Sequence, residues 1–173
     1  MRVVVSTELS CSVPEVWALA RTPWLMRYVS WPLTVFTPLQ PAAWPEQWQP
    51  GDHRVGLRAL GVLPIGAQTI SISFPLTDPD AGRLQLRDNG SGQLVQRWDH
   101  LITVEPAAGG PPGRTAYTDE IDVDAGVLTV VVWLWAHMLY RWRQRRWRRL
   151  TSGTDSYRDT ARRRFGASAR PDS

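Results

Sequence analysis

Alternating apolar and polar positions predict that most of the chain before residue 125 forms an antiparallel sheet. Across residues 68–74 the even positions are Gln, Ile, Ile and Phe, whereas the odd positions are Thr or Ser. Successive side chains of a strand point to opposite faces, so this pattern is typical of a strand with one buried face. Segments with strand character are 3–9, 33–36, 54–62, 68–74, 83–87, 94–105 and 114–124. Turn-forming residues are found at 63–66, 78–82 and 88–92.

Helix signals occur at three places. Ser12 and Glu15 have the spacing of a capping box, which predicts a short helix over 13–20. A Thr-Pro pair opens a second short helix over 23–28, and a glycine opens a long helix over 126–150. The first half of the long helix is apolar almost all round, as expected for a helix covered on more than one side. The order of elements therefore predicts an α+β protein of six to seven strands with one long final helix.

Two polar residues are expected on the buried face of neighbouring strands. The even positions of 94–105 and the odd positions of 114–124 are the apolar ones, so His100 and Asp119 project from the same buried face. A hairpin centred on Gly109-Gly110 predicts these opposite pairs: His100 with Asp119, Trp98 with Ile121, and Ile102 with Tyr117. The loop 106–113 is long enough for the register to slip by two residues, which keeps the shared face.

His100 and Asp119 support two interpretations. As an acid–base pair, the carboxylate would fix the imidazole tautomer and assist proton transfer. As a structural pair, each group would satisfy the other's hydrogen-bonding requirement in the core. The structural interpretation is favoured, because every buried polar group needs a partner and no Ser or Cys nucleophile accompanies the pair in a recognisable motif.

Other residues on the same faces are candidates for the wall of a pocket. Gln68 and Tyr117 could hydrogen-bond the polar end of a ligand, and they could equally fill the core. The apolar candidates are Phe74, Trp98, Trp135 and Met138. Ordinary core packing is the alternative for each of them.

Composition narrows the classes of function. Apolar residues make up 43% of the chain and charged residues 21%, as in globular proteins, but ten tryptophans are unusually many. Cys11 is the only cysteine, so an intramolecular disulfide is impossible. The three histidines have no metal-ligand spacing, and no phosphate-binding loop is present, so we expect neither a metal nor another cofactor. The longest apolar stretch, 127–140, has 14 residues, fewer than the ~20 of a membrane helix, and we expect a cytoplasmic protein.

Charge is distributed unevenly along the chain. Residues 1–140 contain 9 Arg and 13 acidic residues, whereas 141–173 contain 11 Arg and 3 acidic residues. The predicted anionic-surface residues are Arg141, Arg143, Arg145, Arg146, Arg148 and Arg149. This cluster could bind anionic lipid, or nucleic acid as a less favoured partner, or simply be a solvated helix end that complements the helix dipole. Residues 151–173 are expected to form a polar tail.

The motifs, in their order, resemble the START/Bet v 1-like superfamily, in particular its polyketide cyclase/dehydratase-like and ligand-binding branch. The residues that carry this resemblance are Ser12-x-Pro14 with Val16-Trp17, Asp88-x-Gly90-x-Gly92, Trp98-x-His100 and Thr115-x-x-x-Asp119, followed by the final helix. The resemblance covers residues 1–150 as one domain. It implies a helix-grip fold, in which a curved sheet wraps around the C-terminal helix and encloses a cavity.

Three functional hypotheses follow. The first is binding of a small hydrophobic or amphipathic ligand, such as a lipid, polyketide or aromatic compound, with His100, Asp119 and Tyr117 orienting it. The second is a cyclase- or dehydratase-like enzyme that uses His100 as acid or base. The third is an interaction module that uses the Arg-rich helix end. An apolar belt at Val130, Trp133 and Leu134 could also face a second copy of the chain.

Overall fold

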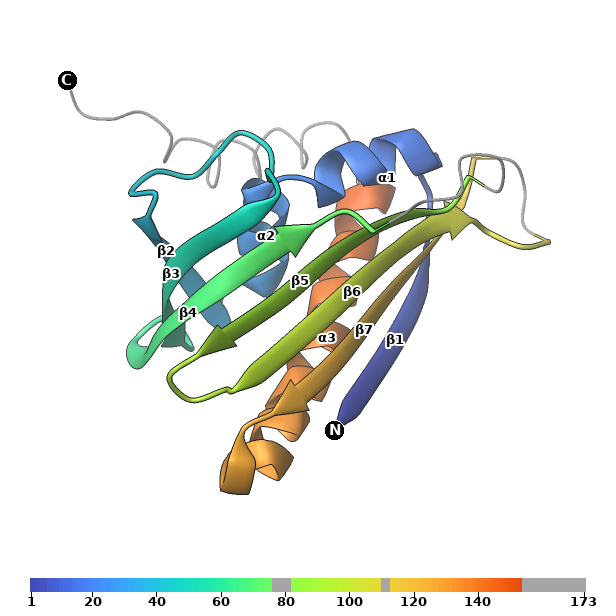
Figure 1. Ribbon diagram of the computed structural model, residues 1–173. Helices are drawn as coiled ribbons and strands as arrows, with labels where there is room; N and C mark the ends of the chain where they lie inside the picture. The colour runs from blue at the N-terminus through green and yellow to red at the C-terminus, as the bar shows by residue number, and fades with distance from the viewer. Residues whose placement is uncertain (76–81, 110–112, 154–173) are drawn as a thin grey trace.

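Seven strands form one antiparallel sheet, as the alternation predicts. The computed structural model describes residues 1–75, 82–109 and 113–153 (Figure 1). The strands are β1 (Arg2–Leu9), β2 (Thr34–Gln40), β3 (Gly51–Ala59), β4 (Leu63–Ser73), β5 (Leu84–Gly92), β6 (Arg97–Pro106) and β7 (Thr115–Asp124). Their order in the sheet is β1-β7-β6-β5-β4-β3-β2, so the first and last strands are neighbours.

The helices confirm the predicted architecture. Helices α1 (Val13–Ala20) and α2 (Pro23–Ser30) follow β1, and α3 (Thr129–Ser152) follows a short 3-10 turn, Gly126–Leu128. Figure 1 shows α3 running along one face of the sheet, with α1 and α2 gathered at one end of the molecule. This is the helix-grip fold. Within the described residues, no helix is both long and apolar enough to cross a membrane.

Helix α3 ends two residues beyond the predicted limit. The expected polar tail begins at 151, but Thr151 and Ser152 continue the helix, and Thr151 is buried. The remainder of that tail, 154–173, lies outside the described residues, as does most of the predicted turn at 78–82.

Two predicted turns are wrong. Residues 63–66 begin β4, and the β3–β4 turn lies just before them at Leu60 and Gly61, which both have positive φ. Residues 88–92 end β5 rather than turning the chain. The glycines there serve close approach, because a Cβ on Gly90 would overlap the carbonyl oxygen of Thr69 on β4. The chain turns only afterwards, where the Gly92 amide donates to the Val95 carbonyl.

The predicted β6–β7 register is shifted by two residues. His100 lies opposite Ile121 rather than Asp119, and Asp119 lies opposite Ile102. Likewise, Trp98 pairs with Val123, and Val104 pairs with Tyr117. A shift of two preserves the face of every side chain, so His100 and Asp119 still project from the same side of the sheet.

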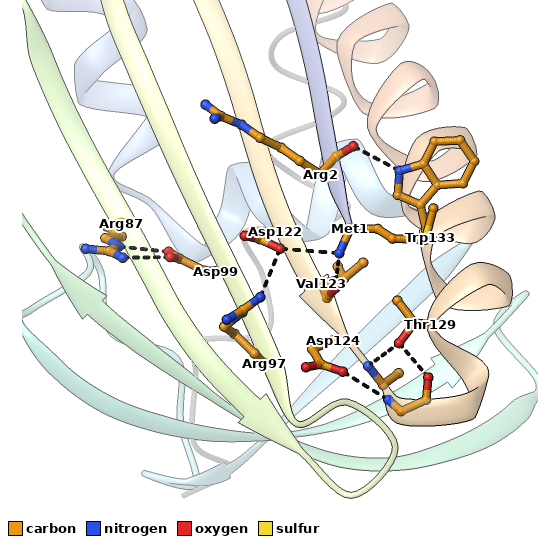
Figure 2. Close-up of polar contacts among 12 residues, drawn as sticks. Met1, Arg2, Arg87, Arg97, Asp99, Asp122, Val123, Asp124, Thr129 and Trp133 are labelled. Atoms are coloured by element: carbon orange, nitrogen blue, oxygen red, sulfur yellow. Dashed lines mark hydrogen bonds and ion pairs between the residues drawn. The ribbon is translucent and has the colours of Figure 1, made fainter.

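Polar contacts attach the beginning of α3 to the sheet edge (Figure 2). The indole nitrogen of Trp133 donates to the Arg2 carbonyl over 2.9 Å, and the Met1 amino group donates to the Val123 carbonyl over 2.6 Å. The Thr129 hydroxyl donates to the Gly126 carbonyl and accepts from the Ala125 amide, which closes the first turn. These contacts hold one end of α3 against β1 and β7.

Candidate ligand-binding cavity

A cavity of about 430 Å³ lies between the sheet and α3. Its volume is within the range of pockets that hold small organic molecules. Most of its lining is apolar, including Leu57, Ile70, Ile72, Leu86, Ile102 and Leu139. At the turn after β3, at the start of β4 and on the first half of α3, the lining residues Leu60, Leu63 and Val131 are exposed. These residues mark where the cavity meets solvent.

The long Pro- and Trp-rich segment before β3 contributes to this cavity. Trp48 lines it and is buried, and the Trp48 amide donates to the Arg21 carbonyl over 2.7 Å. Trp44 packs edge-on against Trp48. Through Trp48 the segment therefore forms part of the cavity wall.

Asp119 is the centre of a buried hydrogen-bond network. The carboxylate oxygen Oδ1 lies 2.8 Å from Nε2 of His100 and accepts from the Tyr117 hydroxyl over 3.2 Å. The other oxygen accepts from Nε2 of Gln144 over 3.2 Å, and the same Gln144 nitrogen donates to the Val5 carbonyl. Asp119 is completely buried, so this one carboxylate joins β6, β7 and α3.

The charge state of the network follows from burial and pairing. Burial lowers the pKa of His100 despite the neighbouring Asp119, so the imidazole is neutral at pH 7. Burial alone would raise the pKa of Asp119, but the hydrogen bond from His100, the charge of Arg143 and the hydrogen bond from Gln144 help to lower it overall, so this carboxyl is ionised. A neutral imidazole facing a carboxylate must carry its proton on Nε2. His100 therefore donates to Asp119, and its Nδ1 is left as an acceptor.

Asp88 is a second buried carboxyl group, and it lines the cavity. Its Oδ1 accepts from the Ser71 amide over 2.8 Å, at a place where β4 and β5 interrupt their regular pairing. Burial raises the pKa of Asp88 to about 7, against opposing effects of the Ser71 hydrogen bond and the charge of Arg143. Near neutral pH this group is therefore divided between its neutral and ionised forms.

Arg143 was predicted to lie on an anionic surface, and that prediction is wrong. Its side chain is 7% exposed, lines the cavity, and lies over the ring of Tyr140 with 4.6 Å between the guanidinium carbon and the ring centroid. A signal was present in the sequence, because Leu139, Tyr140, Arg143 and Trp147 share one face at helical spacing. The density of arginines in this segment obscured that periodicity.

The other arginines of the cluster divide into two groups. Nε of Arg146 donates to the Tyr28 carbonyl over 2.9 Å, and its guanidinium lies over the Tyr28 ring, so it is partly buried against α2. The exposed members are Arg141, Arg145, Arg148 and Arg149. These four remain candidates for an anionic partner.

The predicted pocket residues are only partly brought together. The cavity lining includes Gln68, Trp98, His100, Tyr117 and Trp135. Asp119 is not part of the lining itself but contacts two residues that are. Phe74, which packs edge-on against Trp17, and Met138, which is 45% exposed, are not part of the cavity lining. Both residues lie at the limits of an element face, where alternation or helical period alone does not show where the cavity ends.

Comparisons with known proteins identify the fold. No family model matches the sequence, and no curated protein matches it either. Solved structures do match, including a START superfamily protein from Mycobacterium smegmatis with a TM-score of 0.59 and 12% identity. That match covers 87% of this chain and 96% of the other.

Two further solved structures are similar over nearly their whole length. A protein from Chromobacterium violaceum matches with a TM-score of 0.59 and 11% identity, covering 88% of this chain and 99% of the other. A protein from Mesorhizobium loti matches with a TM-score of 0.58 and 17% identity, covering 90% and 99%. At such low identity the similarity establishes the fold alone, which is the helix-grip fold that these structures share.

Proposed function

We propose that the protein binds a small hydrophobic or amphipathic molecule in the cavity between the sheet and α3. The observation that carries this proposal is an apolar cavity of about 430 Å³ whose polar groups are few. Pockets for small organic molecules have this composition, with apolar walls for affinity and a few polar groups for orientation. In this proposal Tyr117, His100 and Asp88, which line the cavity, orient the ligand.

The first test is to identify what the purified protein carries. Protein purified under mild conditions is extracted with organic solvent, and the extract is analysed by mass spectrometry. A stoichiometric apolar compound supports the proposal. An empty extract, together with no thermal shift from fatty acids or polyaromatic compounds, contradicts it.

A variant with a narrowed cavity locates the bound compound. Ile70 is buried on the cavity-facing side of β4, and Ile70→Trp places a large ring in that space. Ser73, exposed on the same strand and outside the lining, provides the matched control Ser73→Trp. We expect the first variant to lose the compound and the second to retain it. Retention by both variants would place the compound elsewhere.

A second candidate function is acid–base catalysis by His100. The specific observation in its favour is a neutral imidazole that lines the cavity and is oriented by a buried carboxylate. An enzyme of this kind would convert the extracted compound with a rate that depends on the protonation of His100. Incubation of the loaded protein at several pH values distinguishes the two candidates, because a binder returns its ligand unchanged.

A further inference from the structure

Arg143 places a permanent positive charge deep in the cavity. It lies on the same helix as Val131, which is exposed at the mouth, and is about 18 Å further along the axis at 1.5 Å per residue. Burial opposes the charged form of Arg143, but the neighbouring Tyr140, Asp119, Tyr117 and Asp88 raise its pKa overall. The guanidinium is therefore charged at every pH at which the protein is folded.

This charge has no direct partner among the described residues. Nε of Arg143 is buried and makes no hydrogen bond there. No carboxylate lies within 4.0 Å of the guanidinium, since no ion pair of the described residues includes it. The guanidinium lies over the face of the Tyr140 ring. A buried cation in this situation is unfavourable unless an anion or hydrogen-bond acceptor joins it.

The two nearby carboxyl groups are committed elsewhere. Asp119 accepts hydrogen bonds from His100, Tyr117 and Gln144, so its two oxygens are already engaged. Asp88 accepts from the Ser71 amide. Both act on Arg143 through their charge rather than through contact, which leaves the planar donor edge of the guanidinium available to a molecule in the cavity.

We propose that the ligand is an apolar carboxylic acid whose carboxylate enters the cavity first and pairs with Arg143. This inference rests on the proposed function, because it names the class of ligand for the same cavity. The guanidinium matches a carboxylate through two parallel hydrogen bonds, and the apolar walls between Arg143 and the mouth accommodate the hydrocarbon body.

The groups around Arg143 bear on the pH range of binding. Asp88 and Tyr140 face it together with the His100–Asp119 pair and Tyr117. Asp119 is ionised throughout the neutral range, whereas Asp88 becomes ionised as the pH rises through about 7. Ionised Asp88 repels a bound carboxylate and competes for the charge of Arg143. Affinity for the acid should therefore fall as the pH rises from 6 to 8.

Matched probes test the charge on the ligand. Dodecanoate and dodecanol share a hydrocarbon chain and differ in the headgroup, and their affinities are measured by isothermal titration calorimetry below their aggregation concentrations. We expect the wild-type protein at pH 6 to bind dodecanoate at least tenfold more tightly than dodecanol. Arg143→Gln should abolish this preference, because dodecanoate loses at least tenfold more affinity than dodecanol does. Arg141→Gln, which removes an exposed charge from the same helix, should change neither affinity.

Each contrary result has a distinct meaning. Equal wild-type affinity for the two probes overturns the carboxylate proposal but leaves the binding of apolar molecules intact. An equal loss of both probes in Arg143→Gln also overturns it, because Arg143 would then only maintain the cavity. If the Gln variant does not fold, Arg143→Lys with the same two probes replaces it, and loss of the preference there supports the bidentate geometry. Failure of the wild-type protein to bind either probe contradicts the proposed function as well.

Discussion

Replacing Asp88 with asparagine should change how stability depends on pH. As the pH rises from acidic to neutral, the difference in stability between Asp88→Asn and wild type should shift in favour of the variant. The asparagine side chain has nearly the same shape, and its amide oxygen can accept the Ser71 hydrogen bond that the carboxylate now accepts. What changes is the protonation equilibrium. Burial raises the pKa of Asp88 from 3.8 to about 7, so between those values the folded state holds a proton that the unfolded chain has released.

The size and sign of the effect follow from this shift. Because the folded state binds more protons, the stability of the wild-type protein falls as the pH rises through that window. A difference of about three units, at ~1.4 kcal/mol per unit, corresponds to a loss of about 4 kcal/mol between pH 4 and pH 7. Asp88→Asn lacks this contribution. Its stability relative to wild type should therefore increase by about 4 kcal/mol over the window and remain constant above pH 8.

Urea denaturation followed by tryptophan fluorescence at a series of pH values measures this difference. Trp147 is 1% exposed and packs against Tyr117, so unfolding changes its environment strongly. Glu46→Gln removes an exposed carboxyl group and serves as the control, with a difference from wild type that should not vary by more than about 0.5 kcal/mol. If the free energies of unfolding of Asp88→Asn and wild type differ by the same amount at every pH, the reasoning is refuted. The pKa of Asp88 would then be the same in the folded and unfolded states.

Three further substitutions test separate features. His100→Ala should destabilise the protein by about 3 kcal/mol in urea denaturation at pH 7, because it removes a donor from the buried Asp119 carboxylate; a cost below ~1 kcal/mol would show that Asp119 needs no such donor. Gly90→Ala should lower the free energy of unfolding by about 1–3 kcal/mol, because the new Cβ would overlap a β4 carbonyl oxygen. Gly92→Ala should lower it by less, because its new Cβ would lie 3.0 Å from such an oxygen; equal melting temperatures of the two variants would contradict this. Replacing Arg145 and Arg149 together with Gln should cost less than about 1 kcal/mol, because both are exposed; binding of wild type, but not of this variant, to anionic vesicles at low salt would identify the exposed arginines as a lipid-binding surface.

The elements with a clear periodicity were predictable from the sequence. Residues 68–74 alternate strictly and lie within β4, apart from Phe74 just beyond its end. The capping box of Ser12 and Glu15 forms as predicted and begins α1. In both cases the determinant is local, because a few neighbouring residues set the face or the start of the element.

Features that depend on distant contacts were not predictable. The local sequence predicts Gly90 to be a turn residue, and only the fold shows that the carbonyl of Thr69 on another strand lies beside it. The loop between β6 and β7 is long enough to allow two registers that bury the same face of each strand, so the sequence pattern does not distinguish them. Arg143 belongs to a segment whose composition is typical of a solvated helix end, and only the path of α3 across the sheet brings it to the cavity. These features result from packing between segments, which local patterns do not encode.

The position of β1 at the sheet edge has a consequence for the order of folding. Among the described strands, β1 pairs with β7 alone, and the pairs run from Arg2 opposite Asp122 to Leu9 opposite Thr115. During synthesis, β1 therefore lacks this partner until the chain has been made through β7. Pairing strands this far apart in the sequence has a high entropic cost and is slow. The apolar face of β1 stays uncovered until that pairing forms.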